Sequence, residues 1–196
     1  MSVAPEAKVF VADFDDFHEN QHQLELLHAL HSKIPGYRVT LFVIPGLCSL
    51  KWLQTVKTDW MQFALHGEQH GRECLDWTTD DVHKYLDKYE AWGIFEKVFR
   101  APGWVLNQAT FDVLAERKYI LAAKQSDDDR EVIYPGKLYI HRKNRTEIVP
   151  KSDGVQLRIV HGHINNVCGN GLNKKSLERY AKLQGEYRFI SELWNT

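Results

Sequence analysis

The sequence has few cysteines, no excess of charge of either sign and no long apolar run. Its three cysteines are too few and too scattered for a disulfide framework or a thiolate zinc cluster: Cys48, Cys74 and Cys168. The 25 Lys and Arg residues nearly balance the 26 Asp and Glu residues, so a net charge of −1 draws the chain neither to nucleic acid nor to an anionic membrane. The apolar runs are too short to cross a bilayer, and the first residues show no basic start followed by an apolar segment. We therefore expect a reduced, cytoplasmic protein without nucleic-acid or membrane partners.

What the sequence does contain is enough apolar material for a sizeable core and an unusual number of histidines. Apolar residues make up 43% of the 196 residues and aromatic residues 12%, which argues against disorder. No internal repeat, low-complexity tract or Gly/Ser/Pro-rich linker marks a domain boundary, so we expect a single domain, 1–196. The ten histidines, several of them clustered, are the first sign of a chemical site.

Strand-like runs rich in Val, Ile, Phe and Tyr alternate with helix-like runs along the chain. The expected strands are 8–13, 37–44, 62–65, 97–100, 119–124, 137–141 and 155–161, with 187–190 as a further short candidate. The expected helices lie near 18–31, 82–89, 111–115 and 177–181. This alternation predicts an α/β protein with parallel strands, either a barrel or a doubly wound sheet. Segment 126–145 is the least regular and is expected to hold a hairpin or a loop.

Four groups of polar side chains each follow an expected strand. They are Asp13, Asp15 and Asp16 after the first strand, His66 and His70 after the third, 100–104 after the fourth, and His161 and His163 at the end of the seventh. In α/β barrels the carboxyl ends of the strands form the catalytic face, so these groups point to one site.

The first two groups have the composition of a metal centre. The adjacent carboxylates of Asp15 and Asp16 repel each other in an apolar setting unless a cation compensates, although a solvated turn would explain the pair without any site. His66 and His70 are four residues apart, so one helical turn would place both on one face; such a pair can also be incidental. Two imidazoles and one carboxylate leave a coordination position open for water, as catalytic divalent ions require.

The other two groups have the composition of a substrate pocket. Arg100 could hold a buried carboxylate and Trp104 could form a wall of a sugar pocket, although a packed turn explains 100–104 as well. His161 and His163 lie two residues apart on a strand and face the same side, and either imidazole suits protonation of a leaving amine. Because His161 lies within the strand and is held more rigidly, we expect it to be the acid and His163 to bind substrate.

Taken in order, these groups resemble the motif series of the polysaccharide deacetylase family, the NodB-homology or carbohydrate esterase family 4 domain. Phe14-Asp15-Asp16 resembles its Thr-Phe-Asp-Asp-Gly motif, and His66-x-x-x-His70 resembles its His-(Ser/Thr)-x-x-His motif. Segment 100–104 resembles its Arg-x-Pro motif, and the strand that ends at His161 resembles its Leu-x-His or Leu-His motif.

The resemblance implies a single-domain distorted (β/α) barrel of about seven strands. It also implies one divalent metal ion, expected to be Zn²⁺ with Ni²⁺ or Co²⁺ as alternatives because two nitrogen donors and one oxygen donor suit all three. The implied roles are metal ligand for Asp16, His66 and His70, general base for Asp15, holder of that base for Arg100, general acid for His161, and backbone donor to the oxyanion for Gly103.

The chain departs from the family pattern at several positions. Phe17 stands where the family prefers Gly, and Asp13 stands where it prefers Thr. The family motif whose acid tunes the Arg–Asp pair is not recognisable, although Asp127 or Asp128 lies in the right region.

We therefore expect a metal-dependent hydrolase, a deacetylase that removes an acetyl group from an N-acetylated sugar or glycan or from another small acetamide. Hydrolysis of another C–N amide bond, or of an O-acetyl ester, stays open on the same barrel. A catalytically silent carbohydrate-binding module is the alternative from another class, but such a module needs no acid, base and ligand set.

Overall fold

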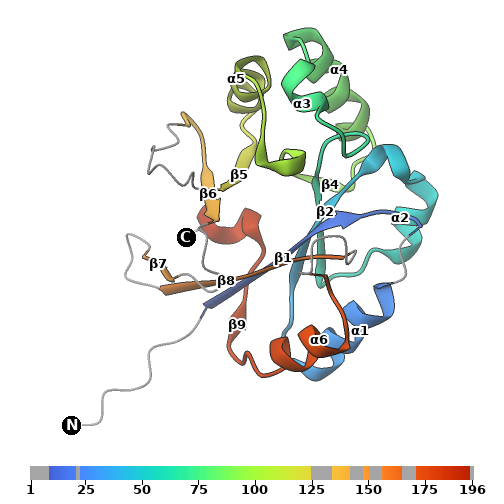
Figure 1. Ribbon diagram of the computed structural model, residues 1–196, viewed down its shortest axis with the longest axis vertical. Coiled ribbons are helices and arrows are strands. Elements are labelled where there is room, and N and C mark those ends of the chain that lie inside the picture. The colour runs from blue at the N-terminus through green and yellow to red at the C-terminus, as the bar shows by residue number, and fades with distance from the viewer. Residues whose placement is uncertain are drawn as a thin grey trace.

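The computed structural model describes residues 9–20, 23–124, 134–141, 148–150, 156–164 and 171–194, which form one curled sheet with helices around it (Figure 1). The strands are β1 (Val9–Phe17), β2 (Val39–Val43), β3 (Met61–Leu65), β4 (Phe95–Phe99), β5 (Ile120–Lys124), β6 (Leu138–His141), β7 (Ile148–Pro150), β8 (Gln156–His163) and β9 (Glu186–Tyr187). Their order is β6-β5-β4-β3-β2-β1-β8-β7, and β9 pairs with the start of β1. Every pairing from β6 to β8 is parallel, and β7 alone runs antiparallel to its neighbour.

Helices follow β1, β2, β3, β4 and β8 along the chain and cover the outside of the sheet. They are α1 (Leu24–Lys33), α2 (Leu50–Val56), α3 (Glu73–Asp76), α4 (Thr79–Glu90), α5 (Gln108–Glu116) and α6 (Lys174–Tyr180), with 3₁₀ turns η1 (Pro45–Leu47), η2 (Pro102–Trp104) and η4 (Ile190–Trp194). The capping side chains of Thr78, Asn107 and Asn173 each accept the N–H three residues ahead, which fixes where α4, α5 and α6 begin. In Figure 1, α1 and α6 lie together beneath the sheet, and α4 and α5 lie above it.

The inner face of the sheet is apolar toward one end and polar toward the other. Alternate side chains of seven strands form an inner apolar cluster, which Ile190 and Leu193 of η4 close at its base. Because side chains on a strand alternate between the two faces, Asp13 and Asp15 continue the inward-facing row of Val9 and Val11. The polar groups therefore lie at the carboxyl ends of the strands, above a packed core.

The expected α/β barrel fold is confirmed: the seven strands from β6 to β8 in the sheet order pair in parallel in one curled sheet. Two boundaries differ, and two elements were not predicted. Strand β1 runs on to Phe17, so its carboxylates lie within the strand and not after it. The first helix begins at Leu24 and not near residue 18, and neither α2 nor β7 was predicted.

Candidate active site

Strand β1 presents two adjacent carboxylates at the same end of the sheet. The register of β1 against β2 shifts between Phe14 and Phe17, and Asp16 has a φ of 64°. This left-handed conformation is uncommon outside glycine but is tolerated by Asp, and such strain is typical of functional positions. Asp15 and Asp16 are both buried, each against a different set of partners. The solvated turn that would have explained the pair without a site is therefore wrong.

Asp16 lies against His66 and His70, the two histidines expected to share a metal ion with it. Its Oδ1 is 2.8 Å from Nε2 of His70 and 3.5 Å from Nε2 of His66. One ligand atom from each of the three residues lies within 4.8 Å of the others. Oδ1 is buried and has no hydrogen bond of regular geometry among the described residues, as expected when three ligand atoms face a common cation.

The second nitrogen of His66 fixes the tautomer of that ring. Its Nδ1 lies 2.9 Å from the carbonyl oxygen of Arg100, and a carbonyl can only accept a hydrogen bond. Nδ1 therefore carries the proton, and Nε2 keeps its lone pair toward Asp16. This is the orientation that metal-binding histidines require.

His66 and His70 come together on a loop, so the expected helical turn between them is wrong. Gly67 at a φ of 66° and His70 at a φ of 59° both lie in the left-handed region, which no regular helix allows. A Cβ at Gly67 would lie 2.6 Å from both Glu73 Oε1 and Pro102 Cγ, so only glycine fits. Glu73 accepts the N–H groups of Glu68 and Gln69 and holds the loop closed.

The charges in this cluster support one another. Burial raises the pKa of Asp16, but the contacts with His66 and His70 outweigh burial and hold that pKa well below its ordinary value. The contact with Asp16 raises the pKa of His70 above its ordinary value of 6.5, against the effect of burial. In the absence of a metal ion, the protein thus favours a carboxylate beside a protonated imidazole.

Arg100 forms an ion pair with both Asp15 and Asp13. It is fully buried, and its Nη1 donates to Asp15 Oδ1 at 2.5 Å and to Asp13 Oδ1 at 2.6 Å. Burial is the largest influence on the pKa of Asp15 and raises it, but Arg100, His66 and His161 together more than offset that effect, and the net pKa lies below the ordinary 3.8. The guanidinium also packs on the rings of Phe42 and Trp104, at 3.8 and 4.4 Å from their centroids.

The two histidines of β8 face the same side, as the sequence predicts, but in different settings. His161 Nδ1 lies 2.7 Å from Asp13 Oδ1, and its Nε2 lies 3.9 Å from Asp15 Oδ2. The rings of His161 and His163 are 5.4 Å apart, and Trp104 packs edge-on against His161. His163 Nδ1 is buried and has no hydrogen bond among the described residues. Burial lowers the pKa of His163, which favours its neutral form.

A second set of three side chains also brings ligand atoms within 4.8 Å of one another: Asp15, His161 and His163. The set is a poorer cation site than the first. Asp15 already pairs with the Arg100 guanidinium, and that fixed positive charge opposes a second cation nearby. The set of Asp16, His66 and His70 contains no such cation and fits a divalent ion better.

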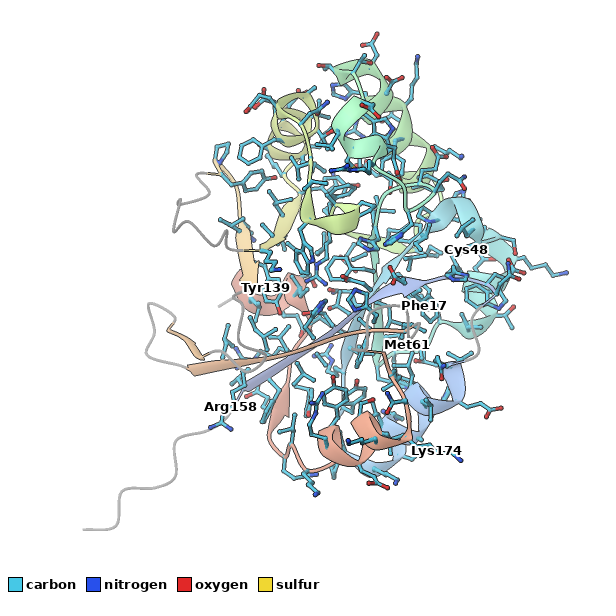
Figure 2. The ribbon with its side chains drawn as sticks, in the orientation of Figure 1. Phe17, Cys48, Met61, Tyr139, Arg158 and Lys174 are labelled. Atoms are coloured by element: carbon cyan, nitrogen blue, oxygen red, sulfur yellow. The ribbon has the colours of Figure 1, made fainter. Side chains whose placement is uncertain are left out.

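The sequence identified most of the cluster, but it gave Asp13 no role and missed Tyr139 and Glu73. The Tyr139 side chain projects from β6 (Figure 2), and its hydroxyl donates to Asp13 Oδ2 at 2.9 Å. The even spacing of Asp13 and Asp15 on a strand was a signal that both face inward. The expected acid at Asp127 or Asp128 lies outside the described residues. Gly103 and Trp104 lie in η2 beside the site, with φ values of 61° and 65°.

Comparisons with known proteins identify the fold. Neither protein-family models nor curated sequences match this chain. Solved structures do match. The Xyl-CE4 domain of a multidomain xylanase from the hindgut metagenome of Trinervitermes trinervoides is 14% identical and covers 97% of this chain and 91% of its own, with a TM-score of 0.61. A family 4 acetyl xylan esterase from Clostridium thermocellum, solved with a cobalt ion, is 12% identical over 95% of this chain and 90% of its own, also at 0.61.

A chitin deacetylase from the fungus Colletotrichum lindemuthianum also matches, with 14% identity over 95% of this chain and 87% of its own and a TM-score of 0.57. These likenesses confirm the fold: the chain has the barrel of the family 4 carbohydrate esterases and polysaccharide deacetylases. Their low sequence identity leaves the activity of this chain to be argued from its own residues.

Proposed function

We propose that this protein is a metal-dependent hydrolase that removes an acetyl group from an N-acetylated sugar or glycan, with 1–196 forming one catalytic domain. The observation that carries the proposal is the separation of two adjacent carboxylates into different chemical settings. Asp16 lies against two imidazoles, whereas Asp15 lies against a buried guanidinium. One setting suits a metal ligand and the other suits a general base.

The metal ligands in this proposal are Asp16, His66 and His70. Two imidazoles and one carboxylate fit Zn²⁺, with Ni²⁺ and Co²⁺ as alternatives, and leave coordination positions for water and substrate. A divalent ion bound there supplies Lewis-acid polarisation of the acetyl carbonyl and of the attacking water.

Asp15 is the proposed general base. Arg100 keeps its carboxylate ionised, and Oδ1 is occupied by that pair, so Oδ2 is the oxygen presented toward His161. An ionised carboxylate with one oxygen oriented into the site can take the proton of the attacking water.

His161 is the proposed general acid. Its Nδ1 faces Asp13, so Nε2 is the nitrogen available to protonate the leaving amine. His163 is less suited to that role, because burial lowers its pKa and favours an imidazole without a proton to give. We assign His163 to substrate binding.

The turn that follows β4 completes the substrate side of the site. The N–H of Trp104 bonds to the Ala101 carbonyl, so we assign the oxyanion contact to the N–H of Gly103. The Trp104 ring lies against both Arg100 and His161, where an aromatic face suits the apolar face of a sugar ring.

None of the helices in the described ranges is long and apolar enough to span a bilayer.

The test is acetate release from a panel of N-acetylated oligosaccharides, O-acetylated oligosaccharides and small acetamides, with and without a chelator. We expect acetate from the N-acetylated sugars, its loss after chelation and its return on adding Zn²⁺. Release that is unaffected by chelation would overturn the metal-dependent mechanism. Release from O-acetyl esters alone would assign the site to an esterase, and binding without release would assign it to a carbohydrate-binding module.

A further inference from the structure

Asp13 lies at the centre of the buried polar cluster, at the position where the family motif has Thr and to which the resemblance gives no role. Its side chain is fully buried, and both oxygens are engaged. Oδ1 faces the Nη1 of Arg100 at 2.6 Å and the Nδ1 of His161 at 2.7 Å, and Oδ2 accepts from the Tyr139 hydroxyl at 2.9 Å. Three strands far apart in the sequence therefore meet at one carboxylate of β1.

The backbone places Asp13 beside His161. The two residues are direct partners in the parallel pairing of β1 with β8, as Asp15 and His163 are two residues further along. Side chains of paired residues on adjacent strands share a face, so the Asp13–His161 contact is built into the register of the sheet.

The contact determines which nitrogen of His161 carries a proton. An ionised carboxylate is an acceptor only, and Arg100 with its fixed charge keeps a carboxylate at Asp13 favourable. Nδ1 of His161 must then be the donor, and Nε2 is left facing Asp15 Oδ2 at 3.9 Å.

We propose that Asp13 is a positioning residue that holds His161 in its Nδ1-protonated tautomer and aligns Arg100 with Asp15, an inference that rests on the proposed function. In this proposal Asp13 supplies, from β1, the acid that the family resemblance implied near Asp127 or Asp128. Asp13 acts through its neighbours and touches no reacting atom. With His161 neutral, the two carboxylates and Arg100 carry a net charge of −1, and a proton on His161 Nε2 neutralises the group.

The direct readout is the tautomer of His161, measured by ¹⁵N NMR of the zinc-loaded protein labelled at histidine, with His161→Ala used to assign the signals. We expect the neutral wild-type ring to carry its proton on Nδ1. A proton on Nε2 would overturn the proposal without any need for a variant at Asp13.

The perturbation is Asp13→Thr, which removes the carboxylate but keeps a side chain suited to a strand. We expect kcat to fall about 100-fold or more with KM little changed, the zinc content to stay as in wild type, and the His161 proton to redistribute between its nitrogens. Asp13→Asn keeps one acceptor and should recover part of kcat. Tyr139→Phe removes only the bond to Oδ2, and we expect a loss of no more than about fivefold.

A folded, zinc-loaded Asp13→Thr with kcat within about fivefold of wild type would show that Asp13 is only structural. If that variant does not fold, the proposal is tested by the kcat values of Asp13→Asn and Tyr139→Phe and by the tautomer of His161 in the wild-type protein. Wild-type protein that shows the expected tautomer but releases no acetate would overturn the proposed function and not the role of Asp13 in orienting His161.

Discussion

Replacing Arg100 by Met tests how the buried charges support one another. The guanidinium is fully buried, and its Nη1 contacts Asp13 Oδ1 at 2.6 Å and Asp15 Oδ1 at 2.5 Å. Met has a similar length and no charge, so Arg100→Met leaves two buried carboxylates without their shared cation. Removing one partner of a buried ion pair costs about 3–5 kcal/mol, against a total free energy of unfolding of about 5–15 kcal/mol for a domain.

The loss in free energy of unfolding caused by Arg100→Met should depend on pH in a defined direction. In wild type the pKa of Asp15 lies below its ordinary 3.8, so its contribution to stability is present above that pH and is lost as pH falls. Arg100 is the largest influence that opposes burial, so without it we expect burial to raise the pKa of Asp15 above its ordinary value. The folded variant then prefers the protonated acid, which is available only at low pH. The destabilisation should therefore be about 3–5 kcal/mol near neutral pH and clearly smaller near pH 4.

Urea unfolding of the metal-free proteins at several pH values measures this difference, with Arg100→Lys as the matched control that keeps a positive charge. The same substitution should move the acid limb of kcat/KM to higher pH, because Asp15 must still be ionised to act as the base. A variant within about 1 kcal/mol of wild type at every pH, with an unmoved acid limb, would refute the pairing of Arg100 with Asp15.

Three further outcomes follow from the site. His161→Ala should abolish turnover with zinc retained, whereas His163→Ala should mainly raise KM; the reverse pattern in kcat and KM would exchange the acid between them. Zinc affinity, measured by competition with a chelator, should fall from about pH 8 to about pH 6, because the pKa of His70 lies above 6.5 and its proton must leave before the ligand binds; a flat profile would remove His70 from the set. Gly67→Ala should destabilise the protein by about 1–3 kcal/mol more than Gly93→Ala, which has the same positive φ but open space around its Cβ; equal losses in urea unfolding would show that the close packing of the loop is unimportant.

The sequence is informative about the strands because most of them are buried on both faces. Near-continuous apolar runs such as 37–44 and 119–124 leave few other interpretations, and the observed β2 and β5 lie within them. The end of a strand is harder to predict where it carries charged residues of a functional site. The acidic residues 15 and 16 break the apolar run of β1, yet the strand continues through them because His70 and Arg100, in loops that follow other strands, compensate their charge.

The site was predictable where neighbouring residues act together and not where the partners are distant. Asp15 and Asp16 are adjacent, and the pair His66 and His70 is local. The spacing of that pair nevertheless suggested a helix, because the left-handed turn at Gly67 leaves no periodic signal. The role of Asp13 was missed because its partners lie in β6, in β8 and directly after β4, and only the folded sheet reveals that they meet.

The division of labour between the adjacent carboxylates is the central claim, and one paired measurement tests it most directly: zinc bound per chain and acetate released, for Asp15→Asn and Asp16→Asn side by side. We expect Asp15→Asn to keep its zinc and lose about 10²–10⁴-fold in kcat, because its carboxylate is needed for the proton and not for the ion. Asp16→Asn should lose its zinc at the same free zinc concentration, and its activity with it. Equal loss of zinc in both variants, or full turnover in Asp15→Asn, would contradict the account.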